Sequence, residues 1–267
     1  MRISTTLSYA LSGSILLSFI AGCGANGSTG ASPSTFSPAL QTASSQRKAT
    51  RQILAPCRNT SASKQPAGVP LASVASFGVL AGSTVTNAGL SVVDGNLGVS
   101  PGTSITGFPP GVINGSSYAG GPVAAQAQAD LAKAYNNVAA RPNPSPLPAD
   151  IGGMTITPGL YVAPVTLGIS GTVTLDGKNN PNSEFIFQIP STLTTAVNSA
   201  VVLTNQANAC NIFWQVGSSA TLDTASTFSG SILAAASVSL GTGSSVTGRV
   251  LAESGAVTLL DNAITVP

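Results

Sequence analysis

Three segments of the chain repeat one spacing of small hydroxyl and amide side chains. Each reads Leu, any residue, Thr, Ala or Gly, any residue, then Asn, Thr or Ser; they are LTTAVN (193–198), LDTAST (222–227) and LGTGSS (240–245). If successive segments stack as neighbouring strands, about 4.8 Å apart, their equivalent side chains form columns. The predicted columns are Thr195, Thr224 and Thr242, and Asn198, Thr227 and Ser245. Such columns could form a binding surface, but exposed Thr is also a good strand former.

An internal repeat predicts the stack that would position these side chains. SATLDTASTFSGSILAAA (219–236) is followed directly by SVSLGTGSSVTGRVLAES (237–254), with seven identities over 18 residues. Repeats of this length, rich in β-branched residues and Gly, favour a β-solenoid. Two sets of equivalent inward-facing core residues are expected: Leu193, Leu222, Leu240 and Leu259, and Phe187, Trp214, Leu233 and Leu251.

Composition and charge exclude several function classes. Only 7% of the residues are charged, and the 29 glycines suit a β protein with many tight turns. From Leu71 onward there are four basic residues against eight acidic ones, so nucleic-acid binding is not expected. The chain has no His, and its Cys residues are isolated, so neither a metal nor a cofactor is expected.

The N-terminal region predicts export. Residues 1–22 combine Arg2, an apolar run and a small-residue ending, as a signal peptide does. The ending IAGC resembles a bacterial lipobox, in which Cys23 would be lipidated; the alternative is an ordinary signal peptide that leaves Cys23 unmodified. Residues 23–70 are rich in Ser, Ala and Pro and predict a disordered tether, so the membrane would be reached only through the anchor at Cys23. Cys57 and Cys210 then either form a disulfide bond or remain unpaired.

One segment of the domain, which we place at 71–267, breaks the β pattern. After Gly-Gly-Pro, apolar residues recur at helical spacing until a proline-rich stretch, which predicts an amphipathic helix over about 122–141. The apolar stripe is Val123, Ala127, Leu131, Ala134, Tyr135 and Val138. We expect this helix to cover part of the core.

Several longer motifs resemble the DUF3494 family of microbial ice-binding proteins. They are GNLGVSPG (95–102), GGMTITPGLY (152–161), NIFWQVGSSATL (211–222) and TGRVLAESGAVTL (247–259), with the predicted helix between the first two. The resemblance implies a mainly β fold, a discontinuous right-handed β-solenoid of triangular cross-section with one long helix packed alongside. It also implies adsorption to ice through the motif Thr, Ala or Gly, any residue, Thr or Asn. We expect the protein to be a monomer. Thr195–Asn198 and Thr224–Thr227 meet this motif in full, and Thr242–Ser245 departs from it by Ser for Thr.

Two alternatives belong to other function classes. Some β-solenoids are polysaccharide-cleaving enzymes, but the eight acidic residues are scattered here and no His is present, so we do not expect an enzyme. A surface or adhesive module could keep the fold without ice activity, because a fold does not determine function. A flat, uncharged Thr face would favour ice, and a groove lined with Asp or aromatic residues would favour a glycan.

Overall fold

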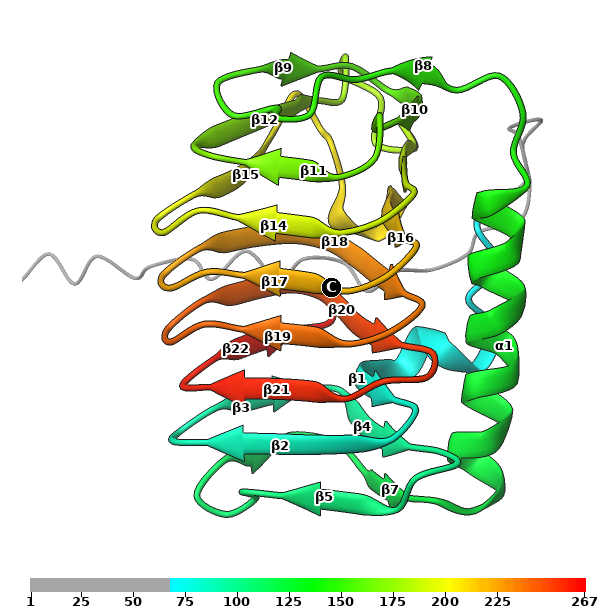
Figure 1. The fold of residues 1–267 in the computed structure, drawn as a ribbon, viewed down its shortest axis with the longest axis vertical. Coiled ribbons are helices and arrows are strands. Elements are labelled where there is room, and N and C mark those ends of the chain that lie inside the picture. Colours follow the sequence, from blue (N-terminus) through cyan, green and yellow to red (C-terminus); the bar gives the residue numbers. More distant parts are fainter. Residues whose placement is uncertain (1–67) are drawn as a thin grey trace, which may run out of the picture. The chain divides into compact units, whose positions relative to one another are not determined.

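The computed structural model describes residues 68–267, which form a stack of short parallel strands with one long helix beside it (Figure 1). The runs are short because a Gly, Pro, Asn or Asp residue interrupts the chain every few residues. Parallel neighbours cannot be joined by hairpins, so the chain must pass round the stack before it adds the next strand on the same side. The strands therefore lie on three sides of the stack, which we call the first, second and third walls.

The first wall is a sheet of seven strands in register. In spatial order these are β11 (Leu167–Ile169), β14 (Leu193–Thr195), β17 (Ala220–Leu222), β19 (Val238–Leu240), β21 (Val257–Leu260), β2 (Thr84–Ala88) and β5 (Ser104–Thr106). Side chains alternate between core and solvent along each strand.

The second and third walls belong to one sheet of 15 strands. The second wall holds β9 (Thr155–Ile156), β12 (Thr172–Asp176), β15 (Ala200–Thr204), β22 (Ala263–Thr265), β3 (Val92–Asp94) and β6 (Val112–Ile113). The third wall holds β8 (Ser145–Pro146), β10 (Gly159–Val162), β13 (Phe185–Ile189), β16 (Ile212–Val216), β1 (Phe77–Ala81), β4 (Asn96–Val99) and β7 (Ser117–Ala119). The strands β18 (Thr227–Ala234) and β20 (Ser245–Ala252) run through both walls.

Two glycines allow β18 and β20 to turn the corner between these walls. Gly230 and Gly248 pair with each other and have φ values of 110° and 151°. A Cβ atom on Gly248 would lie 1.9 Å from the Gly230 carbonyl oxygen, so no larger residue fits without moving the backbone.

Aromatic rings fill the interior of the stack. The rings of Phe187 and Trp214 lie parallel with centroids 3.9 Å apart, and Tyr161 and Phe228 continue the series above and below them. The register predicted for this set is correct for Phe187 and Trp214 but wrong for the next rung, where Trp214 pairs with Ile232.

Leu233 and Leu251 therefore occupy a different place from the one predicted. They pair with each other but point outward from the third wall, into a second apolar cluster that also contains Leu131 and Ala134. Aligning bulky residues by type introduced a shift of one residue, and such a shift moves a strand side chain to the opposite face.

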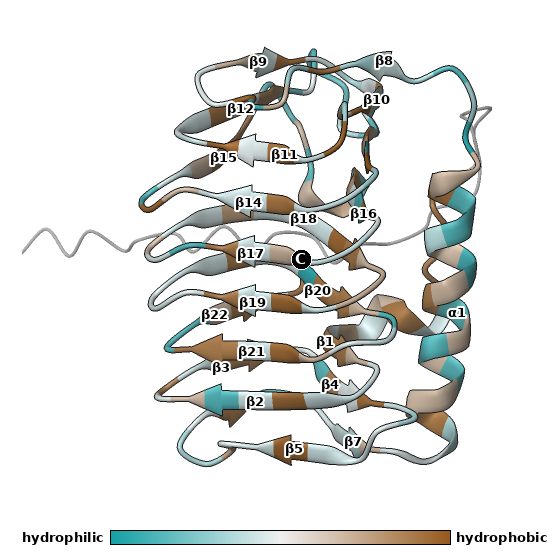
Figure 2. Cartoon of the chain, in the orientation of Figure 1, coloured by the Kyte–Doolittle hydropathy of each residue, from teal (hydrophilic) through white to brown (hydrophobic). Residues whose placement is uncertain are grey.

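The helix α1 (Gly121–Ala139) covers the third wall, close to its predicted bounds of 122–141. Its alanine-rich stripe is buried, whereas Val123 of the predicted stripe is 46% exposed and Asp130 takes a buried position instead. Figure 2 shows most hydrophilic residues of α1 on the side away from the strands. Gln188 Nε2 of β13 donates to the Val138 and Arg141 carbonyl oxygens at 2.7 and 3.0 Å. These bonds supply a donor to carbonyl groups at the C-terminal end of the helix.

The short 3₁₀ helix η1 (Ala72–Ser76) packs against α1 and the third wall; a second one, η2, spans Ala209–Asn211. Buried Arg249 holds η1 in place, because its Nε and Nη2 donate to the Ala75 carbonyl oxygen at 3.1 and 2.7 Å. Burial lowers the pKa of Arg249 to about 10. Within 68–267, no helix has the length and apolar character needed to cross a membrane.

The stack is discontinuous in chain order, as the family resemblance implied. Strands β1 to β7 form one end of it, α1 then runs along its length, and β8 to β22 build from the other end back towards the first strands (Figure 1). The two parts meet where β20, β21 and β22 pair with β1, β2 and β3. The last strand of the chain therefore lies inside the stack.

Candidate functional site

The predicted ladder lies at the corner between the first and second walls. Thr227 of β18 pairs with Ser245 of β20, and the same register places Thr224 beside Thr242 in the preceding turns. Thr224, Thr227 and Thr242 are exposed, and Ser245 is partly exposed. These four residues stack as the repeat predicted.

The third predicted rung is out of register. Thr194 pairs with Thr221 and Ala200 pairs with Thr227, so Val197 occupies the place beside Thr224. Thr195 lies where the other rungs have Leu222 and Leu240; it is only 7% exposed, and its Oγ1 accepts a hydrogen bond from Asp223 N at 2.9 Å.

Asn198 is also displaced from its predicted column. Its backbone N donates to the Thr224 carbonyl oxygen, as Ala225 N donates to that of Thr242, so it is equivalent to Ala225. The equivalent residues Asn198, Ala225 and Gly243 have φ values of 58°, 56° and 71°. Asn tolerates this left-handed conformation. The prediction matched Leu193 to Leu222, two residues away from its observed partner, Ala220.

A larger array of hydroxyl side chains covers the first wall beside this ladder. The outward residue at the centre of each strand forms one column, in pairwise register: Gly168, Thr194, Thr221, Ser239, Thr258, Thr86 and Thr106. All of its Thr and Ser residues are exposed.

A second column lies two residues earlier, at the start of each strand or directly before it. In the same order it consists of Thr166, Thr192, Ser219, Ser237, Ala256, Thr84 and Ser104. The two columns are about 7 Å apart along the strands, and successive rungs are about 4.8 Å apart. We call these two columns together the hydroxyl array. Neither contains an ionisable residue.

The core side of each strand supports the array with buried side chains. The residues that flank the central column point inward and are mostly branched aliphatic, such as Val238 and Leu240 on β19. At the adjoining corner, Ser199, Ser226, Ser244 and Asn262 are buried and bond to the turns around them. A close-packed interior of this kind resists deformation of the wall.

Figure 2 shows the strands of the first wall mainly in apolar and intermediate colours. Asp223 stands at the edge of the array, one position beyond the core residue Leu222. Its Oδ1 accepts a hydrogen bond from Thr224 N at 2.7 Å, which holds this carboxylate in the turn.

The repeat contained a signal for the central column. Thr221, Ser239 and Thr258 recur at 18 and 19 residues, each between two apolar residues. This alternation is typical of a half-buried strand. Thr221 and Ser239 directly precede the motifs LDTAST and LGTGSS, so the predicted site residues lie in the turns next to this column.

Comparison with known proteins matches residues 79–265 to the ice-binding-like family. The chain belongs to this family. It is 50% identical over 196 residues to an ice-binding protein of Nostoc sp. (strain HG1). The aligned region covers 73% of this chain and 72% of that protein.

Solved structures of ice-binding-like proteins share the fold. One from an Antarctic biological consortium gives a TM-score of 0.74 at 43% identity, covering 76% of this chain and 93% of that one. The DUF3494 domain of Shewanella frigidimarina ice-binding protein 1 gives a TM-score of 0.70 at 35% identity, and the match covers 76% of this chain and 98% of that one. These findings confirm the resemblance seen in the sequence.

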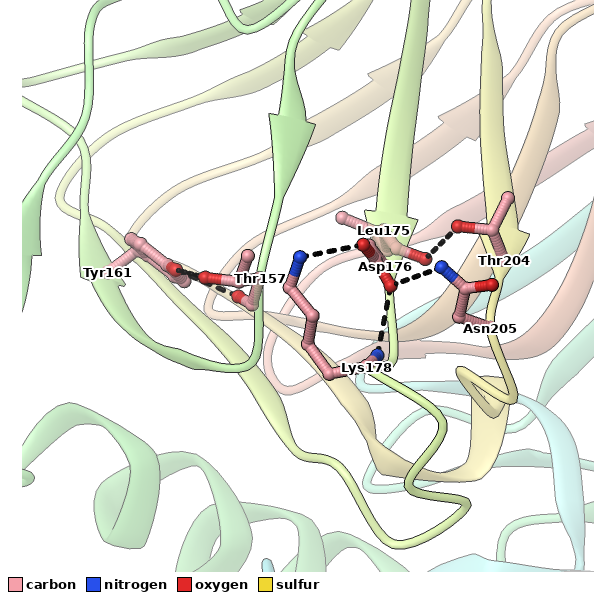
Figure 3. A network of polar contacts seen from close by, with 7 residues as sticks. All are labelled: Thr157, Tyr161, Leu175, Asp176, Lys178, Thr204 and Asn205. Carbon is pink, nitrogen blue, oxygen red and sulfur yellow. Dashed lines mark hydrogen bonds and ion pairs between the residues drawn. The ribbon is translucent and has the colours of Figure 1, made fainter.

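In this member of the ice-binding-like family, a separate polar network lies near one end of the stack (Figure 3). Asp176 accepts hydrogen bonds from Lys178 Nζ, Lys178 N and Asn205 Nδ2 at 2.9, 2.9 and 2.8 Å. These bonds, chiefly that from Lys178 Nζ, lower the pKa of Asp176 to about 2. Nearby, Tyr161 donates to the Thr157 carbonyl oxygen. A general acid near neutral pH needs a raised pKa, so Asp176 does not fit that role.

Cys210 lies apart from the array. Cys210, in η2, takes part in a disulfide bond. The predicted lipidation site Cys23 and the predicted partner Cys57 lie outside the described residues. Over 68–267, no three or more His, Cys, Asp or Glu side chains are grouped as metal ligands.

Proposed function

We propose that this ice-binding-like protein adsorbs to ice through the hydroxyl array of the first wall and so restrains ice growth or recrystallisation. The observation that carries the proposal is the pair of uncharged columns, in register over seven strands. Family membership and the names of the relatives support ice as the partner over a surface or adhesive module.

The array suits ice because it repeats in two directions on a rigid support. Thr methyl groups exclude disordered water, while the hydroxyls hydrogen-bond water at fixed spacings. Each contact is weak, but contacts over seven strands sum when a lattice matches all of them together. Charged groups would hold water in other geometries, and the array carries none.

The corner residues would form the edge of the contact surface. Thr224, Thr227, Thr242 and Ser245 are at least partly exposed and border the array. Thr195 and Asn198 would have structural roles instead, one as a buried acceptor and the other as a turn residue.

The finer features of fold and location also belong to this proposal. We infer that the solenoid is right-handed and triangular in cross-section, and that the protein is a monomer. It would be exported by residues 1–22, with lipidation at Cys23, a tether over 23–70 and the domain over 71–267. Cys57 is the disulfide partner we propose for Cys210.

The test measures thermal hysteresis and recrystallisation inhibition of the purified full chain and of Thr221→Tyr. This substitution projects a ring from the middle of the central column. Thr155→Tyr, at an exposed Thr of the second wall, is the matched control. We expect the native chain and the control to shape ice crystals, and Thr221→Tyr to lose most of the activity. A native chain without effect on ice would refute the proposed function, and an active Thr221→Tyr variant would refute the proposed face.

A further inference from the structure

The hydroxyl array crosses the junction between the two ends of the fold. At its other steps the neighbouring strands belong to consecutive turns of the chain, such as β19 and β21. Between β21 and β2 there is no such continuity, and Thr258 lies beside Thr86 through non-covalent pairing alone. The spacing of the array at this step therefore depends on how the junction is held.

Asn262 connects three successive turns at the corner of this junction. Its backbone N donates to Ser91 Oγ at 2.9 Å, and its carbonyl oxygen accepts from Val92 N at 2.8 Å. Its Nδ2 donates to the Gly241 carbonyl oxygen at 2.7 Å and to Ser244 Oγ at 2.9 Å. One side of Asn262 thus binds the N-terminal turn, and the other binds the turn before its own.

The side-chain oxygen of Asn262 reaches the strand that carries the array. Oδ1 accepts from Leu260 N at 2.5 Å, at the end of β21 and two residues beyond Thr258. Asn262 is 2% exposed, so losing one of these bonds would leave a buried polar group unsatisfied.

The turn that holds Asn262 is one residue shorter than the preceding turn. Leu240 and Val246 are six residues apart, whereas their partners Leu259 and Ile264 are five apart. The longer turns close with a backbone bond, such as that from Ser244 N to the Gly241 carbonyl oxygen. In the shorter turn, Asn262 Oδ1 closes the turn by accepting from Leu260 N, while Nδ2 joins the turn to the preceding one through Gly241 and Ser244. The backbone N and carbonyl oxygen of Asn262 join it to the N-terminal turn.

We infer that Asn262 is a positioning residue for ice binding, which sets the register and rigidity of the array where β21 meets β2. The inference rests on the proposed function. It implies that weakening this corner reduces activity before it unfolds the protein, because the lattice must match both parts of the array at once. A neighbouring bond, from Leu90 N to Asp261 Oδ1 at 2.6 Å, acts at the same step.

The experiment uses the full chain with Asn262→Asp, which keeps the shape but replaces the Nδ2 donor with an acceptor that faces the carbonyl oxygens of Gly241 and Ser244. Leu131→Ala, a cavity in the buried face of α1 away from the array, is the control for general destabilisation. We expect hysteresis to fall on the order of tenfold in Asn262→Asp, because a site held loosely loses its fit. Leu131→Ala should retain most of its thermal hysteresis near 0 °C even if its Tm falls as far as that of Asn262→Asp.

Amide hydrogen exchange supplies a readout that does not depend on ice. Asn262→Asp should accelerate exchange at Leu260 and Val92, which bond to Asn262, while amides in the interior of β16 stay protected. Uniform acceleration along the chain, or hysteresis that follows Tm identically in both variants, would overturn the inference. If the native chain has no hysteresis, the proposed function fails, and the exchange pattern still decides whether Asn262 holds the junction.

Discussion

Thr258 and Thr86 lie side by side on neighbouring strands of the first wall, although they come from opposite ends of the domain. Both are exposed at the centre of the hydroxyl array. The two parts of the chain thus contribute to one surface, and its function depends on their being joined.

This relationship predicts that a substitution on either side of the junction has the same effect. Thr258→Tyr and Thr86→Tyr should each lower thermal hysteresis severalfold, because each projects a ring from the central column. Ice-shaping assays on the two full-length variants provide the measurement. A large loss in one with native activity in the other would show that only one part of the array contacts ice.

Thr224→Tyr should reduce hysteresis less than Thr221→Tyr. Thr221 is central to its strand, whereas Thr224 lies in the turn beyond Asp223, where a ring can tilt away from the wall. The two variants should unfold at similar temperatures, since both sites are exposed. The opposite order of activity would make the corner ladder the main contact surface.

Ice activity should remain constant between pH 5 and pH 9, whereas stability should fall in acid. The array has no ionisable group, but hydrogen bonds lower the folded pKa values of Asp130, Asp150 and Asp176. A carboxyl with a lowered folded pKa stabilises the fold above its unfolded pKa of about 4, and that contribution is lost as the pH falls through the folded value. Burial raises the pKa of Glu253, which acts in the opposite sense.

The measurement for this prediction is Tm against pH, with hysteresis followed in parallel. Asp176→Asn should show a shallower loss of Tm between pH 4 and pH 2, because its folded pKa is about 2. An equally steep loss in the variant would mean that other groups control acid unfolding.

Gln188→Leu should destabilise the fold by about 1–3 kcal/mol, because it leaves buried carbonyl oxygens at the end of α1 without their donor. Thermal unfolding followed by circular dichroism measures this loss. Hysteresis near 0 °C should remain native, since Gln188 lies on the third wall. Reduced activity in a fully folded variant would indicate that α1 affects the array.

Sequence patterns were sufficient for features set by local chemistry. The helix was predicted from its Gly-Gly-Pro start and apolar stripe, and the stack was predicted from the 18-residue repeat over 219–254. The register of Leu193 could not be predicted from the sequence, because its inward-facing partner is Ala220 and not another Leu. A shift of two residues keeps a strand side chain on the same face, so the predicted match to Leu222 also placed Leu193 in the core. The meeting of Thr258 and Thr86 joins distant segments, and no local pattern encodes it.

The length of α1 sets the size of the surface that can meet ice. The helix starts just after β7 in the last N-terminal turn and ends before β8 at the other end of the stack. Its 19 residues span about 28 Å, and the six steps between seven strands span about 29 Å. The length of the helix therefore matches the height of the stack. Each additional strand in the first wall would require about three more helical residues for the chain to reach the far end, where β8 begins.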